Sequence, residues 1–314
     1  MMIENASFQD DSFGENDFYI FSINYETRSR LLYEKLHARL NQCNSLTIII
    51  DNSYLEANLR KQIEQTTEIF SIEYDQQEKM VSRIVSFVEG AKLTEKKVTI
   101  HIDYSAMPRA WYCNLAVKLM HILRADDRVY FWYAEGQYRE CISCYPTAGT
   151  EQYSFFSGKA SICNERPRIH IIALGFDPIR ANAIISTLDP DYVIACFAFY
   201  PDDVEVKNYI KDCNKQIITK SAMTIELHIN DFYGMLSKIV DISNELLVNG
   251  DVILIPDGPK PLILAMSLAP LIIDKPGVSC LHVARNMLCF SKIDIKPTGK
   301  FFGFSLTAMD NVNN

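Results

Sequence analysis

Three short segments, each following a strand-like run, recur in this chain at a spacing of about 150 residues. The segments Asn24–Arg28 and Gly175–Arg180 both read small or polar, aromatic, acidic and then arginine, and they begin 151 residues apart (24 to 175). The other two pairs align at Pro108 and Pro261, 153 residues apart, and at Tyr133 and Val283, 150 residues apart. Such regular spacing predicts one folding unit used twice, through internal duplication.

Strand-like and helical patterns alternate between these segments. Strands are expected at 18–23, 45–51, 98–103, 128–133, 169–174, 191–199, 251–255 and 278–283. Helices are expected at 27–40, 54–66, 78–93, 108–123, 180–188, 204–214, 231–248 and 261–272. This alternation is typical of βαβ units, whose parallel sheets are covered on both faces. The predicted fold class is therefore α/β, with two tandem Rossmann-like parallel-sheet domains.

The domain boundaries follow from the repeat. We expect a disordered leader at 1–17, a first domain at 18–140, a connector at 141–167 and a second domain at 168–314, with a final strand or hairpin at 297–306. The leader has no basic segment, so it does not resemble a signal peptide. No run of 18 apolar residues predicts a membrane span. Several of the nine cysteines lie in apolar runs, which indicates free thiols in a cytoplasmic protein.

Composition limits the class of ligand. Hydrophobic residues make up 48% of the chain, enough for a packed core, which excludes a wholly disordered protein. Lys and Arg number 31 against 39 Asp and Glu, for a net charge of −8. An acidic chain is a poor binder of long nucleic acid, whose phosphates attract positive charge. A local basic pocket for a small phosphorylated ligand remains compatible with this charge.

Ligands of open parallel sheets bind beyond the carboxyl ends of the strands, where the repeated segments lie. After the first strand, Arg28 and Arg30 could hold a phosphate at a helix N-terminus. The alternative is that Glu26 or Thr27 caps this helix and that both arginines are solvated. The corresponding second-half segment offers Gly175 for close approach of backbone, and Asp177 as a helix cap. Asn24, Glu26 and Arg180 complete the ligand-binding candidates of these two segments.

The segment Asp257–Leu262 carries the clearest functional signal. Gly258 permits close backbone approach, Pro261 suits a first helical turn, and Lys260 lies beside the helix N-terminus. A cation there is disfavoured by the helix dipole unless an anion lies between them. The alternative is a tight surface turn with a solvated lysine. Asp257 and Arg285 are further ligand-binding candidates.

The first-half counterpart contains Asp103, Ser105, Met107 and Arg109. Met107 and Arg109 are ligand-binding candidates. Ser105 and Asp103 are the candidates for catalysis, although no activating base stands at a fixed spacing from Ser105.

No cofactor and no metal are expected. Cys141 and Cys144 have metal-ligand spacing, and Cys163 could be a third ligand, but the fourth is only a guess at His170. The chain has no Walker A sequence, no GxGxxG and no HExxH, which disfavours ATP-loop, dinucleotide and zinc-protease chemistry.

The run Asp257-Gly-Pro-Lys-Pro-Leu262, between a strand and a small apolar helix, resembles the late-strand loop of CRISPR-associated Rossmann-fold (CARF) domains. Two such domains in one chain are similar to the fused arrangement called SAVED. Gly258, Lys260 and Pro261 match the family loop, and residues 24–30 correspond to its other ligand-contacting turn. Pro259 replaces the second glycine of that loop, Asp257 stands where Thr or Asn is common, and the first half has no matching lysine.

The resemblance implies a sensor of cyclic nucleotide second messengers in antiviral defence, with the ligand bound between two pseudo-symmetric lobes. From the residues, the expected function is a regulatory protein that recognises a phosphorylated small molecule, with an effector protein as partner and a homodimer left open. One alternative is a phosphodiesterase-like enzyme of the ring-nuclease type acting on such a nucleotide. The other is a two-domain protein-interaction module.

Overall fold

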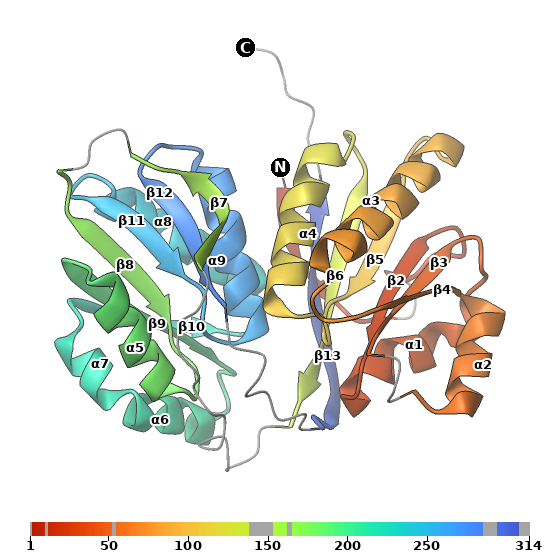
Figure 1. The fold of residues 1–314 in the computed structure, drawn as a ribbon, viewed down its shortest axis with the longest axis horizontal. Helices are drawn as coiled ribbons and strands as arrows, with labels where there is room; N and C mark the ends of the chain where they lie inside the picture. Colours follow the sequence, from red (N-terminus) through yellow and green to blue (C-terminus); the bar gives the residue numbers. More distant parts are fainter. Residues whose placement is uncertain are drawn as a thin grey trace. The chain divides into compact units, whose positions relative to one another are not determined.

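The computed structural model describes residues 2–9, 12–51, 55–137, 153–161, 165–284 and 294–307. The chain divides into two compact units, the first made of 1–138 with 292–314 and the second of 139–291 (Figure 1). Each unit is an α/β layer structure with its own sheet. In the part of the chain just listed, no helix combines the length and the apolar character that crossing a bilayer requires.

The first unit holds a seven-stranded sheet in the order β1-β13-β6-β5-β2-β3-β4. Its strands are β1 (Met2–Ser7), β2 (Phe18–Ile23), β3 (Ser45–Ile50), β4 (Glu68–Ile72), β5 (Thr99–Asp103), β6 (Arg128–Gly136) and β13 (Pro297–Thr307). Its helices are η2 (Thr27–Arg30), α1 (Leu31–Leu36), η3 (His37–Arg39), α2 (Ala57–Thr66), α3 (Gln77–Thr94) and α4 (Arg109–Ile122). Strands β2 to β6 run parallel, whereas β13 pairs antiparallel with β6, and β1 pairs antiparallel with β13.

The second unit holds a six-stranded sheet in the order β10-β9-β8-β11-β12-β7. Its strands are β7 (Tyr153–Lys159), β8 (Arg168–Ala173), β9 (Tyr192–Phe199), β10 (Met223–His228), β11 (Asp251–Ile255) and β12 (Val278–Val283). Its helices are α5 (Pro178–Leu188), α6 (Val204–Cys213), α7 (Lys215–Lys220), α8 (Phe232–Leu246) and α9 (Lys260–Ile273). Among the strands that the structure describes in this sheet, only β7 pairs antiparallel, with β12.

Both units share one topology. Numbered from the first parallel strand of each unit, the five parallel strands follow the order 3-2-1-4-5, and an antiparallel strand lies beside the fifth. In each unit the chain returns from the third strand to place its fourth strand beside its first, so the strand order reverses between β2 and β5 or between β8 and β11. The shared order supports the predicted duplication and places the switch point of each sheet.

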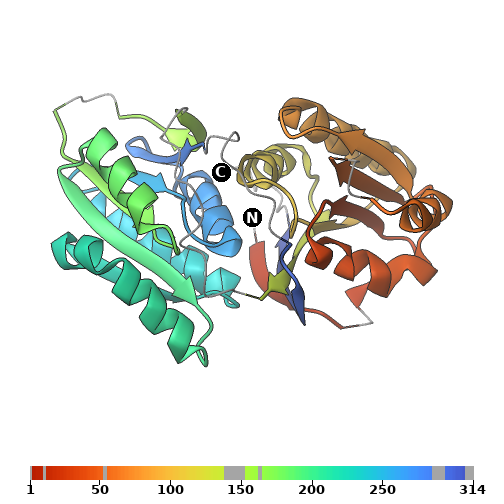
Figure 2. The same cartoon turned by 60° about the horizontal axis from the view of Figure 1, so that its bottom comes forward.

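Burial explains why these segments are strands. Every residue of β3 is buried, as expected for a central parallel strand covered on both faces. Helices α1 and α2 pack their apolar side chains, Leu32 and Ile63 among them, against one face of the first sheet. Helices α5, α6 and α7 do the same in the second unit (Figure 2), where α8 and α9 pack against each other.

Three boundary predictions are wrong. Residues 2–7 of the expected leader form β1, because they pair antiparallel with the edge of β13. The expected connector contains β7, which pairs with β12. The final strand, β13, joins the first sheet through β6 rather than extending the second domain. The edge strands β4 and β10 were not predicted, because each contains polar residues that interrupt its apolar run.

Candidate functional site

The carboxyl edge of each sheet collects the predicted site residues at its switch point. In the first unit the segments after β2 and β5 meet there, and in the second unit those after β8 and β11 do. Open α/β sheets bind ligands at this position because the helices on either side leave toward opposite faces. The two edges are described separately below.

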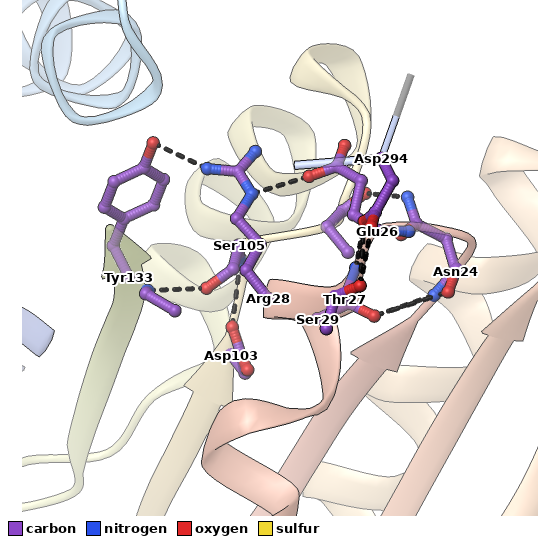
Figure 3. A network of polar contacts seen from close by, with 11 residues as sticks. Asn24, Glu26, Thr27, Arg28, Ser29, Asp103, Ser105, Tyr133 and Asp294 are labelled. Carbon is purple, nitrogen blue, oxygen red and sulfur yellow. Dashed lines mark hydrogen bonds and ion pairs between the residues drawn. The ribbon is translucent and has the colours of Figure 1, made fainter. Parts of the chain in front are cut away.

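Asn24 joins the two segments of the first unit (Figure 3). Its Nδ2 donates to the Ala106 carbonyl at 3.3 Å, and its Oδ1 accepts the Glu26 backbone N–H at 2.8 Å. The side chain is buried. Asn24 therefore fills the space between the loops rather than presenting a polar group to a ligand.

Arg28 is buried in an ion pair rather than exposed. Its Nε donates to Glu26 Oε2 at 2.6 Å, and its Nη1 donates to the Tyr133 hydroxyl at 2.9 Å (Figure 3). Burial acts to lower the pKa of Arg28, but Tyr133 and Glu26 outweigh it and raise that pKa above its ordinary value. The alternative in which Arg28 is solvated is therefore wrong. Arg30 instead lies near the start of α2, with 3.7 Å between its Nη1 and Glu56 Oε1.

A residue that the sequence did not indicate, Asp294, occupies the start of η2. The Thr27 backbone N–H donates to Asp294 Oδ1 at 2.7 Å, and the Thr27 hydroxyl donates to Oδ2 at 2.8 Å (Figure 3). The next residue, Ile295, accepts the Arg28 backbone N–H at 3.2 Å. A carboxylate of the chain itself therefore fills the position where the first loop was expected to hold an anion.

The candidates of the loop after β5 are core residues. Asp103, Ser105 and Met107 are fully buried. Ser105 donates its backbone N–H to Asp103 Oδ1 at 2.9 Å, and its hydroxyl oxygen accepts the Ala134 N–H at 2.7 Å (Figure 3). These contacts hold the loop against β6 and give Ser105 and Asp103 a structural role. Met107 lies in the core, where it cannot touch a ligand at the edge.

In the second unit, Gly175 and Gly258 bring two loop backbones together. A Cβ atom on Gly175 would lie 3.7 Å from Gly258 Cα, and one on Gly258 would lie 3.1 Å from Ala173 Cβ. The Gly175 carbonyl is fixed by Asn214 of the turn between α6 and α7, whose Nδ2 donates to it at 2.8 Å. The two loops therefore lie close to each other at these glycines, and the close approach of their backbone to a ligand stays a prediction.

Arg180 has the same place in the second unit as Arg28 in the first. Its Nε donates to Asp257 Oδ1 at 2.9 Å, and a terminal N–H donates to the Val283 carbonyl at the end of β12. Asp177 caps α5 by accepting the Arg180 backbone N–H at 3.1 Å, as predicted. Arg180 therefore connects the start of α5 with the loop after β11 and with the end of β12.

Lys260 and Arg109 occupy equivalent positions. Each is the first residue of the helix after the fourth parallel strand, α9 or α4, and each follows a proline N-cap, Pro259 or Pro108. The two caps are 151 residues apart (108 to 259), the spacing that also separates Asn24 from Gly175. The sequence alignment of Pro108 with Pro261 is therefore wrong by two residues, and the first unit does carry a matching cation.

Arg285 and the cysteines Cys141, Cys144 and Cys163 lie outside the described residues. Among the residues that the structure does describe, no three His, Cys, Asp or Glu side chains gather in a way that could hold a metal ion. His170, the guessed fourth ligand, is a buried residue of β8.

Comparisons with known proteins give a limited result. No protein-family model matches the chain, and no curated protein matches its sequence. Among solved structures, the chain is similar to a universal stress protein from Archaeoglobus fulgidus, with 8% sequence identity, coverage of 87% of this chain and 97% of that chain, and a TM-score of 0.24. A likeness of this size identifies no family, so the functional argument depends on the residues at the two sheet edges.

Proposed function

We propose that this chain is a ligand-responsive regulatory protein that binds a phosphorylated small molecule, a linear or cyclic nucleotide, at the carboxyl edge of its parallel sheets. The pair of equivalent cations, Arg109 and Lys260, carries the proposal. A cation at the first position of a helix is disfavoured by the helix dipole. A phosphate at the same place is attracted by both the dipole and the cation, which explains why the position carries positive charge in both units.

The charges around the cations support binding of an anion. Of the acidic side chains at the two switch points, Glu26 and Asp257 are each already paired, with Arg28 and Arg180 respectively. Their negative charge is therefore compensated inside the protein. In the second unit, Gly175 and Gly258 also leave backbone without side chains in the loops after β8 and β11, and Gly258 is two residues from Lys260 in the chain.

A phosphodiesterase would need a nucleophile or a base at this edge. The two candidates, Ser105 and Asp103, are buried, and their side chains are hydrogen-bonded, Asp103 to the Ser105 backbone N–H and Ser105 to the Ala134 N–H of β6. The geometry therefore favours binding over turnover. The effector partner and the homodimer remain predictions.

The test is a calorimetric titration of the purified protein with phosphate, AMP, 3′,5′-cyclic AMP and cyclic dinucleotides, together with thermal unfolding. A ligand at about 100 times its Kd should stabilise its unit by about 2.7 kcal/mol. Removing a charged contact should weaken binding roughly 10- to 100-fold, so Lys260→Gln and Arg109→Gln are the test variants. Lys215→Gln, which neutralises an exposed lysine of α7, is the control. The proposal would be overturned if none of these compounds bound, or if all variants bound them with equal affinity.

A further inference from the structure

Next to the glycine contact of the second unit lies a partly exposed aromatic pair. Phe176 directly follows Gly175, and its ring centroid is 5.6 Å from that of Tyr209 on α6, with the planes tilted by 50°. Tyr209 is 42% exposed, and the neighbouring Ile179 at the start of α5 is 70% exposed. Tyr209 and Ile179 therefore present apolar surface to solvent beside the loop that carries Gly175 and Phe176.

The backbone that carries the two rings is held by a hydrogen bond between the end of α6 and the loop after β8. Asn214, one residue beyond α6, donates to the Gly175 carbonyl, so the end of α6 is bonded to the loop that carries Phe176. Phe176 also packs against the core beneath it. A planar ring placed on this surface would meet side chains that lose little freedom on binding, which favours affinity.

An aromatic residue occupies the same place in the first unit. Tyr25 follows Asn24 as Phe176 follows Gly175, at the same spacing of 151 residues (25 to 176). Both units thus place an aromatic side chain immediately after the first parallel strand, on the edge that also carries Arg109 or Lys260. Tyr25 and Phe176 are both half-buried, so part of each side chain lies at the surface of that edge.

We infer that Phe176 and Tyr209 form a stacking subsite for a planar ring of the ligand, whose phosphate lies toward Gly258 and Lys260. The inference rests on the proposed function and deepens it, because it assigns the ligand to compounds that join a nucleobase or similar aryl ring to a phosphate. Sugar phosphates and inorganic phosphate lack the ring and are excluded as the preferred ligand. Stacking of one base on an aromatic side chain contributes about 1–3 kcal/mol, or roughly a 5- to 150-fold change in Kd.

The experiment measures Kd by calorimetry for inorganic phosphate, ribose 5-phosphate, AMP and 3′,5′-cyclic AMP. The variants are Tyr209→Ala and Phe176→Leu. The control is Tyr192→Ala, since Tyr192 is 55% exposed in the same unit but begins β9, at the amino end of that strand. Thermal unfolding checks that each variant is folded. If Phe176→Leu does not fold, the more exposed Tyr209 still provides the test.

We expect AMP or cyclic AMP to bind more tightly than ribose 5-phosphate to the unmodified protein. Tyr209→Ala should weaken the nucleotide at least fivefold and leave ribose 5-phosphate unchanged, and Tyr192→Ala should change neither. Equal Kd values for nucleotide and sugar phosphate, or nucleotide binding unaffected by both variants, would overturn the stacking subsite while leaving the anion site standing. Absence of binding by all four compounds would overturn the proposed function itself, and the subsite with it.

Discussion

Arg180, in the first turn of α5, and Asp257, in the loop after β11, form a buried ion pair across 77 residues of the chain, with 2.9 Å between Nε and Oδ1. Their side chains are 3% and 6% exposed. In the first unit, Arg28 reaches the end of the fifth parallel strand in a similar way but takes its carboxylate, Glu26, from its own loop. Each unit thus uses one buried arginine to hold the carboxyl edge of its sheet in one arrangement.

Loss of Arg180 should destabilise the second unit strongly. Arg180→Gln leaves the Asp257 carboxylate buried without its partner, which costs about 3–5 kcal/mol. Asp257→Asn in the same chain removes the uncompensated charge, so the double variant should be more stable than Arg180→Gln alone. Urea unfolding of the two single variants and the double variant gives the coupling energy.

The matched control is Lys159→Gln, which breaks the exposed pair of Lys159 with Asp274 in the same unit. An exposed pair contributes about 0–1 kcal/mol, so this variant should unfold almost as the unmodified protein does. Additive effects of Arg180→Gln and Asp257→Asn would show that the two residues do not act as a pair.

The contact between Thr27 and Asp294 should contribute as a helix cap does. Asp294→Ala removes the acceptor of the Thr27 N–H and hydroxyl and should lower the free energy of unfolding of the first unit by about 0.5–2 kcal/mol. Asp294→Asn keeps an acceptor and should recover part of the loss. Amide hydrogen exchange at Thr27 gives a local readout, since its protection should fall in the alanine variant. Unchanged exchange would contradict the cap.

Sequence patterns predicted the layers of the fold because buried parallel strands are continuous apolar runs. Strand β3, with every residue buried, is easily recognised. Edge strands are not: β10 buries only two of its six residues, so its pattern resembles that of a polar loop. The hydrophobic pattern of a segment also does not indicate which sheet the strand will join. The pairing of β13 with β6 depends on contacts between distant parts of the chain.

The position of the candidate site could be predicted from the sequence, but the contacts that its side chains make could not. The repeated spacing located the loops at the carboxyl edge, because parallel strands end together. It did not show that Arg28 would be buried against Glu26, since burial depends on how the loops fold over the edge. The contact of Thr27 with Asp294 spans 267 residues and has no signal in either local sequence. Tyr133, noted only as the end of a repeated segment, holds Arg28 through its hydroxyl.

Ser105→Ala distinguishes a structural serine from a nucleophile. The variant leaves the buried Ala134 N–H without the hydroxyl oxygen that accepts it, which should cost about 1–3 kcal/mol of stability. Nucleotide affinity should stay unchanged. The control is Ser243→Ala on α8, because Ser243 is equally buried and its hydroxyl has no partner in the part of the chain that the structure describes. Nucleotide turnover that disappears in Ser105→Ala would instead support the enzyme alternative.

His170 should make the second unit sensitive to acid. Burial in β8, and then the charge of Arg168, lower the pKa of His170 to about 4, while Asp191 acts in the opposite direction. An unfolded histidine has a pKa of about 6.5, so the unfolded chain binds the proton first as pH falls. His170 therefore stabilises the fold fully above pH 6.5 and loses about 3 kcal/mol of that contribution between pH 7 and pH 4.

His101 in the first unit contributes in the same direction, because burial lowers its pKa despite its bond to Asp17. The two contributions are separated by substitution. His170→Leu should flatten the decline of the unfolding free energy between pH 7 and pH 4, with the remaining slope assigned to groups such as His101. Urea unfolding at a series of pH values provides the measurement, and NMR titration of the His170 ring should show a neutral imidazole at pH 5. An unchanged slope in His170→Leu, together with a ring that protonates near pH 6.5, would mean that the imidazole is hydrated in the folded protein.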